Sequence, residues 1–358
     1  MNQDYIQPNE WSILEEGFDV ERVKSSESLF SIGNGVMGQR ANFEENYSGP
    51  SFQGSYIGGV YYPDKTKVGW WKNGYPEYFA KVLNAPNWIG INVFVNDEAL
   101  DLFTCKKVEN FKRELNMKEG FHRRSFVATL PNDIEISVKA TRFLSIVEDE
   151  LGAIDFEIEV LNSDAEVRFE PYLDGGITNT DANWEERFWK TLEVKSEGNK
   201  GFVLSKTLKT EFHVNTYMQS EVLLNGQKQD VDFTETKTED KLTFSYSIKA
   251  EKGQKVSLRK YAGYVTDMNH KCSDLVEAAS KVLDYATKAG FAKLLQEQKE
   301  AWEKIWEMAD ITIEGDVKAQ QGIRFNIFQL NQTYLGKDER LNIGPKGFTG
   351  EKYGGSTY

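Results

Sequence analysis

The sequence has little cysteine and little histidine, and both shortages exclude kinds of structure or site. Its two cysteines, Cys105 and Cys272, are far apart in 358 residues and make no disulfide framework. The three histidines, His122, His213 and His270, are isolated in the sequence from one another and from the cysteines. We therefore predict a reducing compartment, no metal site and no cofactor.

Long apolar runs and an excess of basic residues are also missing. No stretch approaches the roughly 18 apolar residues of a membrane-spanning helix, and residues 1–5 form neither a basic nor an apolar leader. The formal net charge of -13 disfavours nucleic acid and anionic membranes as partners. The sequence thus predicts a cytoplasmic protein whose ligand is a neutral molecule or a small ion.

Short segments of alternating apolar and polar residues recur between about residue 88 and residue 265. They include residues 89–95, 134–140, 154–160, 242–248 and 256–261, separated by Gly, Asn, Asp and Pro. An alternation of period two is typical of half-buried strands. Many strands without intervening helices predict a large antiparallel sandwich.

The hydrophobic period changes to that of helices near residue 272. The apolar positions of two predicted linker helices are Leu275, Ala278, Ala279, Val282, Leu283 and Ala286, then Phe291, Leu294, Leu295, Trp302 and Ile305. Residues 317–335 predict a third helix with Ile323, Ile327, Leu330 and Tyr334 on one face. We expect that apolar face to be exposed, and residues 336–358 to form a loop.

Three motifs have both a functional and a structural interpretation. Residues 31–40 (SIGNGVMGQR) contain three glycines, which suit a nucleotide-binding loop less well than an early β-hairpin where backbone crosses closely. Residues 61–76 gather aromatic residues, including Trp70 and Trp71, that could stack on sugar rings or fix the loop to a neighbouring domain. Glu185 and Glu186 could supply a general acid, but adjacent acids on a loop are usually solvated.

Several long motifs resemble glycoside hydrolase family 65, in the form found in maltose phosphorylases. These motifs are GPKGFTGEKYGG at residues 344–355, GGVYYPD at 58–64, GWWKNGYP at 69–76 and ERFW at 186–189. The resemblance extends from about Trp11 to the last residue. It implies a mainly β fold: a large antiparallel super-β-sandwich (residues 1–268), a helical linker (269–316) and the first helix and loop of an incomplete (α/α)6 barrel (317–358).

The resemblance also implies a reaction and a set of site residues. Family members of this type cleave maltose with inorganic phosphate, and invert the anomeric centre to give β-glucose 1-phosphate and glucose. The catalytic glutamate is expected beyond residue 358, so no acid of this chain inherits that role, and the chain alone is expected to be inactive. The implied substrate-binding residues are Arg324, Lys346, Glu351, Lys352, Trp70 and Trp71.

Alternatives remain open at this point. For Arg324, a salt bridge that anchors the third helix is as good an interpretation as sugar contact. The substrate could be kojibiose, trehalose or nigerose, and water could replace phosphate. A non-catalytic carbohydrate-binding module is the alternative from another class. The expected partner is a disaccharide. The longer protein that this chain is expected to belong to, called the parent protein below, is expected to form a homodimer.

Overall fold

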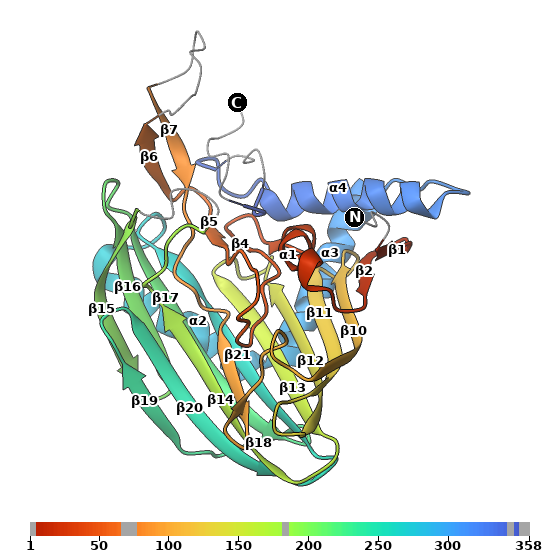
Figure 1. Ribbon diagram of the computed structural model, residues 1–358. Helices are drawn as coiled ribbons and strands as arrows, with labels where there is room; N and C mark the ends of the chain where they lie inside the picture. The colour runs from red at the N-terminus through yellow and green to blue at the C-terminus, as the bar shows by residue number, and fades with distance from the viewer. Residues whose placement is uncertain (1–4, 66–76, 181–185, 342–346, 351–358) are drawn as a thin grey trace.

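The computed structural model describes residues 5–65, 77–180, 186–341 and 347–350, and a large antiparallel sheet is its main feature (Figure 1). Within these residues the sheet has eleven strands. In spatial order they are β1 (Ile6–Gln7), β2 (Ser12–Glu16), β10 (Lys107–Asn116), β11 (Phe121–Thr129), β12 (Glu135–Leu144), β13 (Leu151–Val160), β21 (Lys255–Thr266), β17 (His213–Leu224), β16 (Lys200–Thr207) and β15 (Trp189–Glu197), with β18 (Gln227–Gln229) paired to β17.

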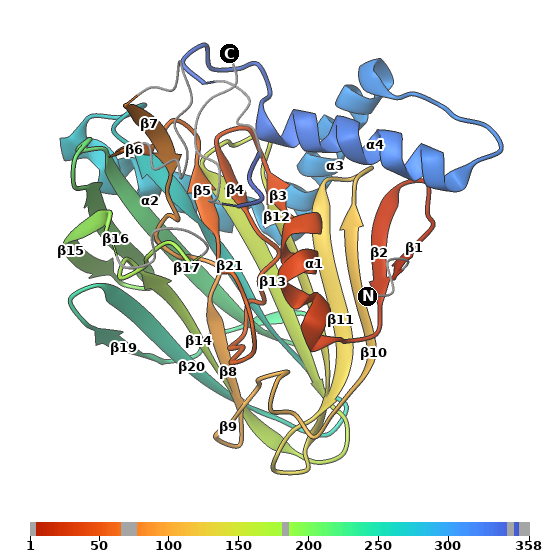
Figure 2. The same cartoon turned by 45° about the horizontal axis from the view of Figure 1, so that its top comes forward.

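A smaller antiparallel sheet packs on one face of the large one and completes the predicted sandwich (Figure 2). Its order is β19 (Phe233–Lys237), β20 (Lys241–Ala250), β14 (Ala165–Asp174), β8 (Ile91–Val95) and β9 (Glu98–Ala99). The rings of Phe156 on β13 and Phe169 on β14 meet edge to face, with centroids 6.4 Å apart. The predicted fold class, a mainly β antiparallel sandwich followed by helices, is confirmed.

The alternation along β13 explains why the sequence signal was reliable. Ile154, Phe156 and Ile158 are fully buried, whereas Asp155 and Glu157 between them are half-buried. Successive side chains of a strand point to opposite faces of the sheet, so period two marks the face that packs on the second sheet.

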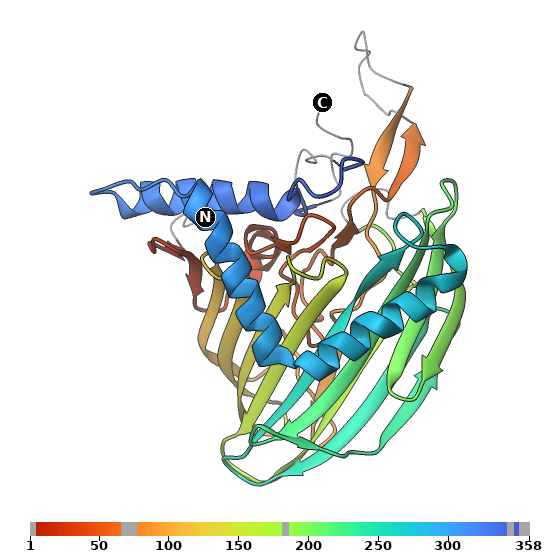
Figure 3. The same cartoon turned by 180° about the vertical axis from the view of Figure 1, so that it is seen from behind.

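Helices α2 (Leu275–Ala289) and α3 (Phe291–Ala309) cross the other face of the large sheet (Figure 3). Leu275, Ala279 and Leu283 of α2 are buried against a second core that includes Tyr217 and Tyr261 of the sheet. Gly290 has φ +77° and separates the two helices, a conformation that glycine adopts without strain. The predicted linker helices and their apolar faces are confirmed.

The buried side chains of helix α4 (Val317–Thr333) are mostly polar, and Phe328 is the fully buried apolar one among them. Gln321 Nε2 donates to the carbonyls of Gln7 and Ser12, and Gln332 Oε1 accepts from the Gly33 amide at 2.9 Å. These side chains satisfy backbone groups that burial would otherwise leave unpaired. The predicted exposure of the apolar face is confirmed for Leu330, which is 54% exposed, whereas Ile323, Ile327 and Tyr334 are half-buried.

Short elements connect the two sheets to these helices. They are the helices η1 (Val20–Arg22), α1 (Val23–Leu29) and η2 (Cys272–Asp274), a three-stranded sheet of β3 (Ile32–Gly33), β4 (Met37–Gln39) and β5 (Ser55–Ile57), and the hairpin of β6 (Tyr61–Lys65) and β7 (Tyr78–Val82). They lie on the side of the sandwich where α4 ends (Figure 1).

A cluster of charged side chains is buried in the sandwich beneath the segment that follows β4. Arg124 on β11 donates to the carboxylates of both Glu44 and Glu45, at 2.8 Å for the Glu44 pair. Arg142 on β12 lies 3.2 Å from Glu44. These four side chains are at most 1% exposed. The arginines keep the pKa of Glu44 below its ordinary range against the opposing effect of burial.

His122 lies beside this cluster and makes stability depend on pH. Burial, followed by the charges of Arg142, Arg113 and Arg124, holds its pKa well below the usual 6.5. Below that pH the unfolded chain therefore binds a proton that the folded chain does not. We expect the contribution of His122 to lower the free energy of unfolding as pH drops from 7 to 5, by up to about 1.4 kcal/mol per pH unit.

Chemical denaturation of the unsubstituted chain and of His122→Gln at several pH values isolates this contribution. Burial raises the pKa of Glu15 and Glu27, so these carboxyls act in the opposite direction in both proteins. Subtracting the pH dependence of one protein from that of the other removes the contribution of these two carboxyls. Equal pH slopes in the two proteins would contradict a buried neutral His122.

Candidate functional site

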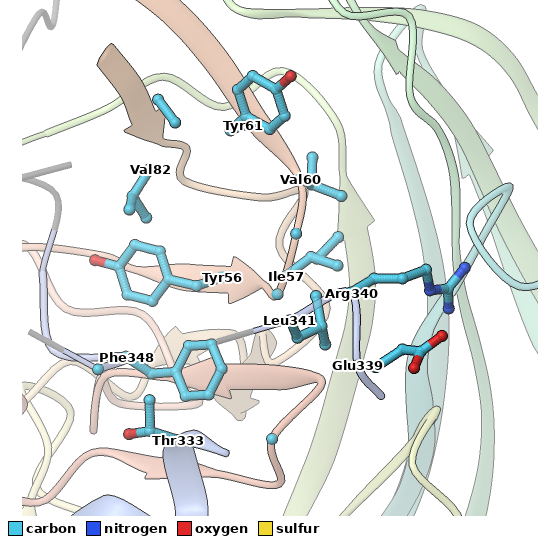
Figure 4. Close-up of a pocket in the computed structure, with 15 residues that line it drawn as sticks. Tyr56, Ile57, Val60, Tyr61, Val82, Thr333, Glu339, Arg340, Leu341 and Phe348 are labelled. Atoms are coloured by element: carbon cyan, nitrogen blue, oxygen red, sulfur yellow. The ribbon is translucent and has the colours of Figure 1, made fainter. Parts of the chain in front are cut away.

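A cavity of about 410 Å³ lies where strands β5, β6 and β7 meet the segment that follows α4 (Figure 4). It is lined by Gly35, Tyr56, Ile57, Gly58, Gly59, Val60, Tyr61, Ala80, Val82, Thr333, Glu339, Arg340, Leu341, Gly347 and Phe348. Figure 4 shows Tyr56 and Phe348 on one side of the view, and Glu339 and Arg340 on the other. The volume falls within the usual range of small-molecule sites. An apolar wall with aromatic rings and a charged end suits a polar molecule that has one apolar face.

Two glycines of the β3–β4 hairpin allow Phe348 to form part of this wall. A Cβ atom on Gly38 would lie 2.0 Å from Cγ of Phe348, and one on Gly33 would lie 2.6 Å from its Cδ2. Gly33 and Gly38 are paired across the hairpin. The hairpin interpretation of residues 31–40 is therefore confirmed, and the close approach comes from an aromatic side chain more than 300 residues away.

Arg40 fixes the backbone next to Phe348. Its guanidinium donates to the carbonyl of Thr349, to that of Lys24 at 2.8 Å and to that of Phe52 at 2.9 Å. Glu27 lies 3.6 Å from the same guanidinium and balances its charge. One buried arginine thus joins α1, the segment after β4 and the segment that carries Phe348.

Arg340 at the charged end of the cavity is held by two neighbouring segments. Its guanidinium donates to both oxygens of Asp338, and this bonding lowers the pKa of Asp338 to about 2. It also donates to the Met268 carbonyl and to Asn269 Oδ1, each at 2.5 Å. The turn after β21 therefore sets the position of Arg340.

Arg324, a predicted substrate-binding residue, lies on the buried face of α4. Its guanidinium makes a two-pronged contact with Asp310 at 2.8 and 2.9 Å, and lies 3.6 Å from the centre of the Trp11 ring. The hydrogen bonds from Arg324 lower the pKa of Asp310. This arrangement is the anchoring salt bridge of the structural interpretation. Sugar contact by Arg324 stays a prediction.

The other predicted substrate-binding residues, Trp70, Trp71, Lys346, Glu351 and Lys352, lie outside the described residues. Glu185 lies outside them as well. Their predicted roles therefore stay predictions.

Sequence reasoning missed one cluster of three potential ligand side chains. His213 Nδ1 lies 3.1 Å from Asp267 Oδ2, and Cys272 Sγ lies 3.7 Å from the same oxygen. Their ligand atoms all lie within 4.8 Å of one another. Burial and the Asp267 charge raise the pKa of the Cys272 thiol, which argues against a reactive thiolate. The histidine is isolated in sequence, and only strand pairing brings it to the other two residues.

In the part of the chain that the structure describes, no helix has the length and apolarity needed to cross a lipid bilayer.

Comparison with protein families gives two adjacent matches. The model described as "Glycosyl hydrolase family 65, N-terminal domain" matches residues 13–305. The model of the family 65 central catalytic domain matches residues 324–358.

Similar proteins agree with these matches. A maltose phosphorylase from Bacillus subtilis (strain 168) is 43% identical over 360 residues, which cover 100% of this chain and 46% of that protein. An α,α-trehalose phosphorylase from Thermoanaerobacter brockii is 33% identical, covering 97% of this chain and 46% of that protein. A solved structure named "Putative kojibiose phosphorylase from human microbiome" superposes with a TM-score of 0.88 at 28% identity, over 98% of this chain and 45% of that one. The chain thus spans about half the length of the curated relatives it matches.

Proposed function

Because this chain belongs to glycoside hydrolase family 65, we propose that it is the sandwich, linker and start of the barrel of an inverting disaccharide phosphorylase that cleaves maltose with inorganic phosphate. The products would be β-glucose 1-phosphate and glucose. The observation that carries the choice of maltose is the 43% identity to a maltose phosphorylase across the whole chain. The 33% identity to a trehalose phosphorylase keeps other disaccharides as the second candidate.

In the proposed reaction one carboxylic acid protonates the glycosidic oxygen while phosphate attacks the anomeric carbon from the opposite face. Phosphate then takes the place of the water, and of its activating base, in an inverting hydrolase. We assign the acid to the part of the parent protein beyond this chain, so none of the residues described above is catalytic.

We propose that this chain contributes one wall of the sugar site. Tyr61, which is 42% exposed, offers an aromatic face suited to the C–H face of a glucose ring, and the buried rings of Tyr56 and Phe348 support the wall. The remaining Nη1–H of Arg340 offers a hydrogen bond to a hydroxyl group. Arg40 acts at a distance from the sugar, because it holds the backbone of Thr349 next to Phe348. The predicted contacts from Arg324, Lys346, Glu351, Lys352, Trp70 and Trp71 belong to the same proposal.

We further propose that the parent protein is a homodimer, as the resemblance implies, and that it is cytoplasmic, as the composition of this chain predicts. The net charge of -13 on this 358-residue chain fits an uncharged disaccharide better than a polyanion.

An assay on two lengths of the protein tests the proposed function. We expect the protein extended to the length of its relatives to release glucose 1-phosphate from maltose only when phosphate is present. The 358-residue chain should release none. Trehalose, kojibiose and nigerose serve as the substrate panel, and omission of phosphate separates phosphorolysis from hydrolysis.

Each outcome of this assay decides one part of the proposal. Release of glucose without phosphate would replace phosphorolysis by hydrolysis. A higher kcat/KM on another disaccharide would replace maltose as the substrate. Activity of the 358-residue chain would overturn the assignment of the acid to the missing part of the barrel, and inactivity of the long form on all four sugars would favour a binding module.

A further inference from the structure

His213, Asp267 and Cys272 meet because two central strands end side by side. His213 is the first residue of β17 and Asp267 directly follows β21, and the Asp267 amide donates to the His213 carbonyl at 3.0 Å. The amides of Asn269 and His270 both bond back to the Thr266 carbonyl, so the chain turns and brings Cys272 to the same place. Two of the three side chains therefore stand on rigid, hydrogen-bonded backbone, as a preorganised site requires.

Two of the separations between the three ligand atoms are close to those of a tetrahedral site, and the third is within 4.8 Å. With bonds of about 2.1 Å to nitrogen and oxygen and about 2.3 Å to sulfur, a zinc ion holds neighbouring N and O ligands about 3.4 Å apart, and S and O ligands about 3.6 Å apart. The separations here are 3.1 Å for His213 to Asp267 and 3.7 Å for Cys272 to Asp267. Side-chain rotations that move these atoms by a few tenths of an ångström bring both separations to the values expected around a zinc ion.

We propose that His213, Asp267 and Cys272 form a binding site for one thiophilic divalent cation of the Zn²⁺ type. One neutral imidazole, one carboxylate and one thiolate supply nitrogen, oxygen and sulfur ligands, the set that zinc accepts and that magnesium and calcium do not favour. The thiolate and the carboxylate together balance the charge of the ion. Cys272 is exposed and the other two side chains are 29% and 20% exposed, so the fourth position is open to water.

The site would join three parts of the molecule. Its ligands come from strand β17, from the turn that follows β21 and from η2, which leads into α2. The turn between Asp267 and Cys272 also carries the Met268 carbonyl and the Asn269 side chain that hold Arg340 at the cavity. Binding of the ion fixes the ends of this turn and thereby the wall of the cavity. The proposal does not depend on which reaction the parent protein catalyses.

Cobalt titration of the reduced, metal-free 358-residue chain tests the proposal. Co²⁺ should produce a near-ultraviolet thiolate charge-transfer band and strong visible bands of a tetrahedral centre, saturating at one ion per chain. Zn²⁺ should abolish these bands by displacement. Zn²⁺ should also raise the melting temperature of the unsubstituted 358-residue chain by several degrees.

Three variants connect the signal to the residues. Cys272→Ser should remove the charge-transfer band and the thermal shift, and His213→Gln should weaken Co²⁺ binding at least tenfold. Cys105→Ser is the matched control, because Cys105 is the other cysteine and lies outside the cluster, and it should leave the titration unchanged. Absence of a thiolate band in the unsubstituted chain, or a band that survives Cys272→Ser, would overturn the proposal.

Discussion

Replacing Arg124 by methionine is expected to lower the free energy of unfolding by about 3–5 kcal/mol. Removal of one partner from a buried ion pair leaves its counter-charge in a medium that solvates it poorly, and this cost exceeds the net contribution of the intact pair. Methionine keeps much of the volume of the arginine chain, so the loss reports the charge rather than a cavity.

The geometry makes the effect of Arg124 unusually direct. Its guanidinium is the shared donor to Glu44 and Glu45, and after its removal Arg142 faces only Glu44, at 3.2 Å. The Glu45 carboxylate, whose side chain is fully buried, is left without its arginine.

Arg187→Met is the matched control for this prediction. Arg187 is 68% exposed and lies 3.8 Å from Asp240, so its removal should cost less than about 1 kcal/mol. Urea denaturation followed by far-ultraviolet circular dichroism measures both variants. A loss at Arg124 no larger than that at Arg187 would show that the buried cluster contributes little to stability.

The sequence carries a signal for this cluster at an inward-facing position of strand β11. Arg124 stands in phase with Phe126 and Ala128 on β11, and all three are buried. A charge at an inward position of a strand needs a partner that is buried too. Its partners, Glu44 and Glu45, lie in a segment without regular structure, so no local pattern predicted the pairing.

Sandwich and linker followed from the sequence because period two and helical spacing are local signals. The docking of α4 did not, because most of its buried positions are polar: Gln320, Gln321 and Arg324 bond to neighbouring backbone and acidic groups. A helical-wheel argument places such residues on the solvent side. Partial exposure of the opposite, more apolar face is the consequence.

The candidate site was predicted less completely than the fold. Resemblance to a family indicated the chemistry, but the cavity wall joins Tyr56 to Phe348 across nearly the whole chain. The cluster of His213, Asp267 and Cys272 likewise depends on the pairing of β17 with β21, which are neighbours in the sheet but not in the sequence. Contacts between distant segments leave no periodic signal.

Gly38→Ala is expected to displace Phe348 and cost up to about 3 kcal/mol of stability. The added Cβ would lie 2.0 Å from the ring carbon Cγ, closer than any non-bonded contact, and Phe348 is 7% exposed in its slot. Either the hairpin shifts or the ring leaves, and overpacking of this kind typically costs about 1–3 kcal/mol. Departure of the ring would open the cavity wall and free the backbone that Arg40 holds.

Gly322→Ala provides a control with the opposite sign. Gly322 lies inside α4, and a Cβ there meets nothing within 4 Å, so alanine should stabilise the helix by about 0.5–1 kcal/mol. Urea denaturation gives the two free energies, and hydrogen exchange at the amides of residues 348–350 reports whether the segment detaches. We expect faster exchange there only in Gly38→Ala. Unchanged exchange in Gly38→Ala would mean that the hairpin yields instead, because the ring would then remain in contact with a displaced β4.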